Sequence, residues 1–234
     1  MMKKLIPALF TLSLGFLASC ADQYKVLGTT NVHGMEGQML YLKTFHEDDM
    51  KTLDSCRVTH GKFQFNGQVD SVVMANMFMG NEGGMPVVLE GGELTIRLDE
   101  LEQRVTGGPL NDTLYNFIRH KSQIENQLAE ISQREGRMVM DGMDHDEVIR
   151  ILGRQADSLI AEHDRLETNF IKQNYNNVLG PGVFMFMTSG FDFPILTPQI
   201  EEIVATATPY FLNHPYVKGY MHAAEQNMEK LQGQ

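Results

Sequence analysis

The chain has 234 residues, 42% of them hydrophobic, and a formal net charge of −11 at pH 7. Residues 1–19 carry two of the 19 basic residues and none of the 30 acidic ones, so the net charge without them is −13. Such an acidic chain is not expected to bind nucleic acid or an anionic lipid surface through its overall charge. The apolar content is enough for one large domain or two small ones and excludes an intrinsically disordered chain.

The first residues have the pattern of a secretory signal. Lys3 and Lys4 form a positive segment, and Leu5–Leu17 form an apolar stretch. That stretch is too short to span a bilayer, which takes about 20 apolar residues in a helix. It is therefore expected to be a removable signal segment, with a plain N-terminal helix as the alternative.

The apolar stretch ends in Leu17-Ala18-Ser19-Cys20, which resembles the lipobox of bacterial lipoproteins. The resemblance implies cleavage between Ser19 and Cys20 and attachment of a diacylglyceryl group to the Cys20 thiol. Several buried acyl chains would anchor the protein stably without a transmembrane helix. Ala21 is not the aspartate that retains lipoproteins in the inner membrane of enteric bacteria, so the resemblance favours the outer membrane. An ordinary secretion signal with an incidental cysteine is the alternative.

Lipidation of Cys20 would leave Cys56 as the only thiol of a chain that resides in an oxidising compartment. Cys56 could then form no intramolecular disulfide, and the sequence contains no Cys-x-x-Cys motif. We expect Cys56 to be a small buried residue within a strand, since free cysteines are often buried. A reactive thiol is the alternative.

Short apolar or alternating runs separated by glycine-containing turns follow between Tyr24 and Val105. They predict an antiparallel sandwich or a barrel-like sheet. Thr59-His60-Gly61-Lys62 suits a tight hairpin turn, and the alternation after it places Phe63 and Phe65 on one buried face. The expected strands are Tyr24–Thr29, Gln38–Lys43, Leu53–Val58, Lys62–Phe65, Val72–Met79, Met85–Leu89, Glu93–Leu98 and Gln103–Val105.

At Gly107-Gly108-Pro109 the apolar period changes to that of a helix. Pro109 suits a first helical position, and Asp112 places negative charge near the helix N-terminus. Two heptad-like seams then predict two antiparallel helices joined near Asp141-Gly142, with a coiled-coil dimer as the alternative. The first seam is Leu110, Leu114, Phe117, Lys121, Ile124, Leu128 and Ile131, and the second is Ile149, Leu152, Ala156, Leu159, His163, Leu166, Phe170 and Gln173.

After a Phe- and Met-rich run at Val183–Met187, prolines delimit two short helices, about Pro198–Ala207 and Tyr216–Leu231, which we expect to pack back on the hairpin. The expected fold class is α+β, with an N-terminal antiparallel β-sandwich-like domain followed by a helical hairpin and short C-terminal helices. The expected division is residues 1–19 as signal peptide, 20–106 as the sandwich-like domain and 107–234 as the helical region.

A series of short motifs resembles a domain of unknown function found in lipoproteins of the Bacteroidota. In that family the domain usually sits between the lipid anchor and a C-terminal thioredoxin-like or peroxiredoxin-like domain. Here that redox domain is not expected, because the chain stops at Gln234 and lacks its Cys-x-x-Cys, so the resemblance carries over no redox activity. The motifs are Leu40-Tyr41-Leu42, Leu53-Asp54-Ser55, residues 61–67, residues 88–92, Thr106-Gly107, Leu110-Asn111-Asp112, Val178-Leu179-Gly180 and residues 214–218.

Polar clusters along the chain are better explained by structural roles than by chemistry. The acidic group Asp141, Asp144, His145, Asp146 and Glu147 lacks the spacing of a Ca²⁺ loop and fits helix capping. His163, on the second seam, is expected to be a buried, hydrogen-bonded histidine or a contact between the helices.

Other motifs are also weak. His214 and His222 are eight residues apart and form no His-x-x-x-His pair. The segments Gly80–Gly84 and Glu90–Gly92 lack the lysine of a phosphate-binding loop and are expected to be turns. The triplets that begin at Asp70, Asp112 and Asp157 resemble the acceptor motif for O-glycosylation in Bacteroidota.

No catalytic residue, metal ligand or cofactor site is expected. The sequence therefore favours a non-enzymatic lipid-anchored envelope lipoprotein that acts as a binding or scaffold module. Its expected partners are the membrane, through the lipid, and an envelope protein or a small ligand, but not nucleic acid. The alternative is an accessory to thiol-disulfide or peroxide-stress proteins of the envelope.

Overall fold

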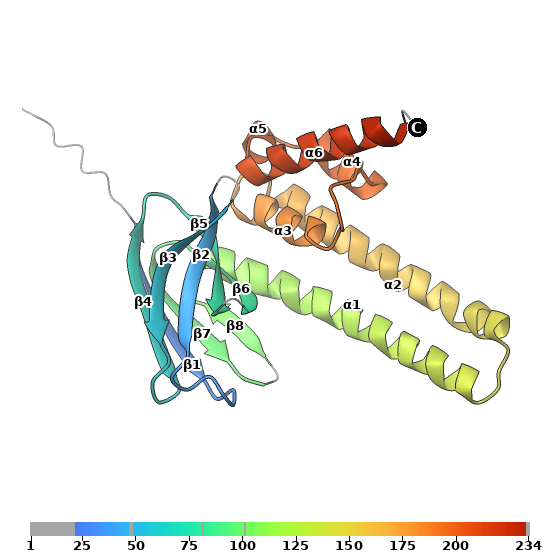
Figure 1. Ribbon diagram of the computed structural model, residues 1–234, viewed down its shortest axis with the longest axis horizontal. Helices are drawn as coiled ribbons and strands as arrows, with labels where there is room; N and C mark the ends of the chain where they lie inside the picture. The colour runs from blue at the N-terminus through green and yellow to red at the C-terminus, as the bar shows by residue number, and fades with distance from the viewer. Residues whose placement is uncertain (1–21, 47–48, 81, 101, 233–234) are drawn as a thin grey trace, which may run out of the picture.

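Two four-stranded sheets form the N-terminal part of the computed structural model, which describes residues 22–46, 49–80, 82–100 and 102–232 (Figure 1). One sheet has the order β4-β1-β7-β8 and the other has the order β3-β2-β5-β6. The eight strands confirm the expected series, with ends that differ by a few residues. They are β1 (Asp22–Thr30), β2 (Met39–His46), β3 (Asp49–Arg57), β4 (Lys62–Val69), β5 (Val73–Met79), β6 (Glu82–Leu89), β7 (Gly92–Leu98) and β8 (Gln103–Thr106).

Antiparallel pairing dominates both sheets, with one exception among the described pairs. Strands β1 and β7 run parallel, with Val26 opposite Leu94. The intervening strands β2, β3, β5 and β6 belong to the second sheet, so β7 enters the first sheet beside β1 after a crossover. An alternating pattern marks a strand but says nothing about the direction of its neighbour, so the sequence could not predict this pair.

The expected hairpin turn between β3 and β4 is confirmed. His60 and Gly61 have φ values of 52° and 66°, the left-handed region that both central residues of a type I′ turn require. Thr59 and Lys62 exchange backbone hydrogen bonds of 2.8 and 3.1 Å. Phe63 and Phe65 after the turn are buried, as predicted.

Strand β6 is joined to the first helix, α1 (Pro109–Met140), by two side chains. Glu90 accepts the backbone N–H groups of Leu110 and Asn111 at 3.1 and 3.0 Å. The buried amide of Asn111 bonds the backbone N–H and C=O of Val88 at 2.9 and 2.8 Å, as a neighbouring strand would. Gly108, at the helix N-cap, has no side chain to cap the helix, and a Cβ there would lie 2.1 Å from Glu90. Glu90 therefore caps α1 from a distant position in the sequence.

Helices α1 and α2 (His145–Gln173) form the predicted antiparallel hairpin, which projects from the sandwich (Figure 1). Leu114, Phe117 and Ile124 of the first seam are buried. The second seam is wrong at its two ends, because Ile149 is 49% exposed and Gln173 is exposed. Val148 is fully buried in place of Ile149. Two adjacent apolar residues permit two phases of the seam, and the packing at the hairpin tip selects the earlier one.

The C-terminal helices pack on α2 and on each other, as expected. They are α3 (Leu179–Thr188), α4 (Pro198–Ala205), α5 (Pro209–Leu212) and α6 (Pro215–Gln232). The sequence left α3 without an assigned structure and placed the end of α4 two residues too late. One hydrophobic core runs from the sandwich into these helices and includes Val26, Leu94, Phe117 and Phe184. Among the described residues, no helix is long and apolar enough to cross a membrane.

Candidate functional site

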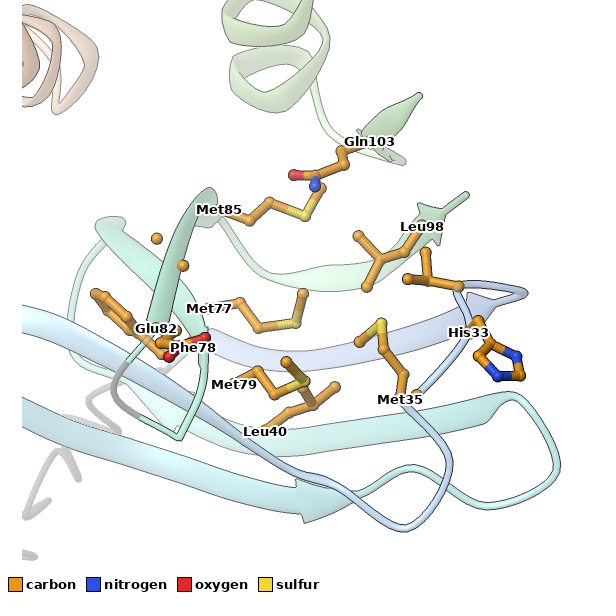
Figure 2. Close-up of a pocket in the computed structure, with 14 residues that line it drawn as sticks. His33, Met35, Leu40, Met77, Phe78, Met79, Glu82, Met85, Leu98 and Gln103 are labelled. Atoms are coloured by element: carbon orange, nitrogen blue, oxygen red, sulfur yellow. The ribbon is translucent and has the colours of Figure 1, made fainter. Parts of the chain in front are cut away.

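A cavity of about 450 Å³ opens at one end of the sandwich, beyond the last residue of β1 and beside the β5–β6 turn (Figure 2). Its walls come from the β1–β2 loop, from β2, β5 and β6 of one sheet, and from β7 and β8 of the other. Figure 2 shows six mainly apolar side chains around this space, Met35, Leu40, Met77, Met79, Met85 and Leu98.

The strand register places three of the four methionines close together. Met77 of β5 lies directly opposite Met85 of β6, and directly opposite residues have Cβ atoms about 4.5–5.5 Å apart. Met79 is two residues further along β5, on the same face as Met77, and lies opposite Leu40 of β2. Met79 is 37% exposed, so it lies at the mouth of the cavity, whereas Met77 and Met85 lie deeper.

Met35 reaches the cavity from the β1–β2 loop. The Thr30 hydroxyl lies 3.2 Å from the Met35 sulfur and donates a hydrogen bond to it. The loop is tied to the β3–β4 turn, because the Glu36 carboxylate accepts the backbone N–H groups of His60 and Gly61 at 2.9 and 3.1 Å. These two bonds lower the pKa of Glu36. Met35 is thus held in place by the fold.

The most deeply buried methionines gather at this place. Of the described methionines, only Met35, Met77 and Met85 are buried, and all three line the cavity. The inner faces of the sheets further from the cavity carry Val26, Leu42, Leu94, Ile96 and Val105 instead. Sequence reasoning missed this site because methionine is commonly a gap filler of cores. In addition, Met35 lies far along the chain from the other three methionines.

Polar groups at the rim are few. His33, Glu82 and Gln103 are exposed, and in Figure 2 the His33 ring points away from the methionines. The cavity therefore combines an apolar, sulfur-rich interior with a sparse polar edge. Such a surface can bind a ligand, and the two titratable side chains among its lining residues, His33 and Glu82, are exposed at the rim.

A second cluster of charges lies between α1 and α2. The Lys121 ammonium lies 2.7 Å from Glu125 and 3.1 Å from the buried Glu167. It also lies 2.7 Å from Nε2 of His163 and donates to it, because an ammonium has no acceptor. Burial alone would lower the pKa of Lys121, but the two carboxylates raise it. The expected contact of His163 with the other helix is confirmed. Lys121 is a polar residue on an otherwise apolar seam, and its ammonium pairs there with Glu167 of the facing helix.

The acidic group at the hairpin tip caps α2. Asp144 accepts the N–H groups of Asp146 and Glu147 at 3.0 and 3.3 Å, and both acids follow in the first turn. Within the described ranges, no group of three or more His, Cys, Asp or Glu side chains could hold a metal ion.

His214 and His222 do not line the cavity, whereas Gly83 and Gly84 border it. Burial lowers the pKa of His214, and its buried Nδ1 has no partner among the described residues. His222 is exposed and contacts Gln226. The turn expected at Gly80–Gly84 is confirmed at Gly80 only, because Gly83 and Gly84 lie in β6 at an irregularity of its pairing with β5, with φ values of 92° and 148°.

Cys56 lies in β3 but is only partly buried, which corrects the expectation of a buried residue. Strand β3 is at the edge of its sheet, and this edge position leaves part of the thiol accessible. Burial of the other part raises the pKa of Cys56 to about 11.

The predicted lipidation and cleavage site, Ser19 and Cys20, lies outside the described residues. The three glycosylation-like triplets fall in different settings. Ser71 is exposed between β4 and β5, and Ser158 is exposed on α2. The Thr113 hydroxyl donates to the backbone carbonyl of Pro109 within α1.

A family model described as "Domain of unknown function (DUF4369)" matches residues 24–114. The matched range contains both sheets, all four cavity methionines and the Glu90–Asn111 junction, and it ends in the second turn of α1. This part of the chain therefore carries a domain of unknown function. A comparison with curated proteins gave no match.

Proposed function

We propose that this chain is a non-enzymatic, lipid-anchored protein of the cell envelope that binds a small ligand in the methionine-lined cavity. The observation that carries the proposal is the cavity itself, whose interior is apolar and rich in sulfur, with His33 and Glu82 at its exposed rim. The lipobox-like Leu17-Ala18-Ser19-Cys20 supports the anchor, and the motifs that resemble Bacteroidota lipoproteins support the envelope location.

The position of the anchor relative to the cavity supports this function. Cys20 is two residues before Asp22, the first residue of β1, and two extended residues span at most about 7 Å. The nine residues of β1 extend about 26 Å from Asp22 to Thr30. The cavity lies beyond Thr30, so an anchor on Cys20 would hold the ligand site at the end of the sandwich that faces away from the bilayer.

The redox alternative has less support. A thiol whose pKa is about 11 is almost fully protonated at neutral pH, whereas the thiolate is the reactive species. Cys56 also has no second cysteine among the described residues. An accessory role that relies on a separate redox protein would have to use a surface other than this thiol.

Two experiments test the proposal. Growth of cells with labelled palmitate should label the wild-type protein and not Cys20→Ala, and a labelled mutant would disprove the anchor. Native mass spectrometry of the protein extracted from its own membranes should show a bound mass. Leu98→Phe, which places a larger side chain into the cavity wall, should abolish that mass while leaving the protein folded.

The matched control is Leu110→Phe, a change of the same kind at a partly buried position outside the cavity. A bound mass that persists in Leu98→Phe, or no bound mass in the wild-type protein, would contradict ligand binding in this cavity.

A further inference from the structure

We infer that the ligand of the cavity is the soft monovalent cation Cu(I), held by the thioether sulfurs of Met35, Met77, Met79 and Met85. This inference rests on the proposed function, because it names the ligand class of the same site. It starts from the three buried methionines gathered at one end of a fold whose other buried hydrophobic residues are aliphatic or aromatic.

The arrangement of the four residues suits one shared ion. Met77 and Met85 are a directly opposed pair on neighbouring strands, and Met79 follows on the same face. Met35 approaches from the loop between β1 and β2, and Figure 2 shows the four side chains extending into one space from different sides. Methionine has three rotatable bonds in its side chain, so thioethers placed this closely can adjust around an ion.

The chemistry of the donors selects the ion. Thioethers are soft ligands and favour Cu(I), whereas Mg²⁺, Ca²⁺ and Mn²⁺ require carboxylate, carbonyl or water oxygens. Glu82 is the one carboxylate among the described lining residues, and it is exposed at the rim. A hard divalent cation among the methionines would therefore lose most of its hydration without replacement, whereas a soft cation of low charge is suited to the thioethers.

The electrostatics of the chain favour a cation over an anion. Its formal charge is −11 in full and −13 without residues 1–19. Such a net charge attracts cations to the surface over several ångströms, although it is screened beyond about 8 Å at physiological ionic strength. Glu82, at the rim, is an acidic group at the entrance.

An apolar organic molecule could use the same walls, so the sulfur atoms must be tested apart from the apolar shape. Leucine has nearly the volume of methionine, and Met-to-Leu changes in cores cost less than about 1.5 kcal/mol. A Met77→Leu/Met85→Leu variant therefore keeps an apolar cavity and removes two ligands. Met140→Leu/Met143→Leu is the matched control, because both residues are exposed at the hairpin tip.

The experiment is an anaerobic titration of the purified lipidated protein in detergent with Cu(I), in competition with a coloured Cu(I) chelator. Ag(I) serves as a second soft probe that does not change oxidation state. The wild-type protein should bind one ion per chain. The cavity variant should lose affinity by at least about tenfold, since even indirect supporting residues of metal sites contribute 10–100-fold. The hairpin-tip variant should bind like the wild-type protein.

A second measurement needs no variant. In the NMR spectrum, addition of Ag(I) should shift the ε-methyl resonances of the cavity methionines and leave those of Met140 and Met143 unchanged. Equal affinity of the cavity variant and the wild-type protein would overturn the inference, as would the absence of binding to either ion.

The two proposals fail separately. An organic mass in the native protein that Leu98→Phe removes, together with no Cu(I) binding, would overturn the Cu(I) site and leave the ligand-binding function intact. The absence of any bound mass together with the absence of Cu(I) binding would overturn both.

Discussion

Glu90 and Asn111, 21 residues apart, form one junction between a sheet edge and a helix N-terminus. One carboxylate oxygen of Glu90 accepts both the backbone N–H and the side-chain amide of Asn111, at 3.0 and 2.9 Å. The other oxygen accepts the N–H of Leu110. The side chain of Asn111 is fully buried and completes the hydrogen bonding of Val88 in the edge strand β6. Two polar side chains thus satisfy a helix end and a strand edge together.

Removal of the Glu90 carboxylate should destabilise the protein. Glu90→Ala removes the cap of α1, and loss of an N-cap side chain costs about 0.5–2 kcal/mol. Glu93→Ala is the matched control, because Glu93 makes an exposed ion pair with Lys25, and such pairs contribute about 0–1 kcal/mol. Urea unfolding followed by circular dichroism gives both free energies. Equal losses in the two variants would show that Glu90 is not a cap of this importance.

Replacement of Asn111 should cost more than replacement of a surface residue of the same helix. Asn111→Leu leaves the buried N–H and C=O of Val88 without partners, and each unsatisfied buried group costs about 1–3 kcal/mol. Asn116→Leu, on an exposed face of α1, is expected to change stability by less than about 0.5 kcal/mol. The same urea experiment decides between them, and a stable Asn111→Leu protein would mean that water or another group replaces the amide.

This junction illustrates what the sequence could and could not predict. All eight strands and the start of α1 at Pro109 followed from alternation, turn residues and proline, which are local signals. The segment at Glu90 was read as a turn only, because its partners lie 20 and 21 residues away. The cavity was not predicted because its methionines come together through the register of β5 and β6 and through the β1–β2 loop, which the alternation of apolar residues does not specify. Local patterns specify elements, whereas sites assembled from distant elements depend on register and packing.

The phase of the second helix can be tested directly at the hairpin tip. Val148 is fully buried against Ile131 and Leu152 in a small separate core, whereas the neighbouring Ile149 is about half exposed. Val148→Ala should therefore lose much of the benefit of a buried valine, which is about 1.5–3 kcal/mol for the whole side chain. Ile149→Ala should change the free energy of unfolding by about 0.5 kcal/mol or less. A larger loss in Ile149→Ala would reverse the assignment of the seam.

The charge cluster of the hairpin should behave as a unit. Glu167 is 5% exposed, so Lys121→Met leaves a buried carboxylate without its ammonium partner, and breaking a buried pair costs about 3–5 kcal/mol. Replacement of both residues, Lys121→Met/Glu167→Leu, removes the stranded charge as well and should recover most of that loss. Because the pKa of Lys121 is raised in the folded protein, its stabilising effect is complete below the ordinary pKa of 10.5. The effect should disappear as the pH rises through the higher folded value. Thermal melts of the three proteins between pH 7 and pH 11 measure both effects, and a double variant no more stable than Lys121→Met would contradict a coupled pair.

Cys56 should be an unreactive thiol in the folded protein. Its pKa of about 11 lies well above the ordinary value of 9.0, so at pH 8 the thiolate fraction should be about 100-fold smaller than that of an unperturbed thiol. Alkylation by iodoacetamide in a Cys20→Ala background, which leaves Cys56 as the only thiol, should be slow and should accelerate on unfolding in urea.

The raised pKa of Cys56 also means that the protonated thiol favours the folded state below pH 9, and that this contribution to stability is lost as the pH rises through about 11. An alkylation rate that is already high in the folded protein at pH 8 would place the pKa near or below its ordinary value. That result would restore Cys56 as a candidate for thiol chemistry in the envelope.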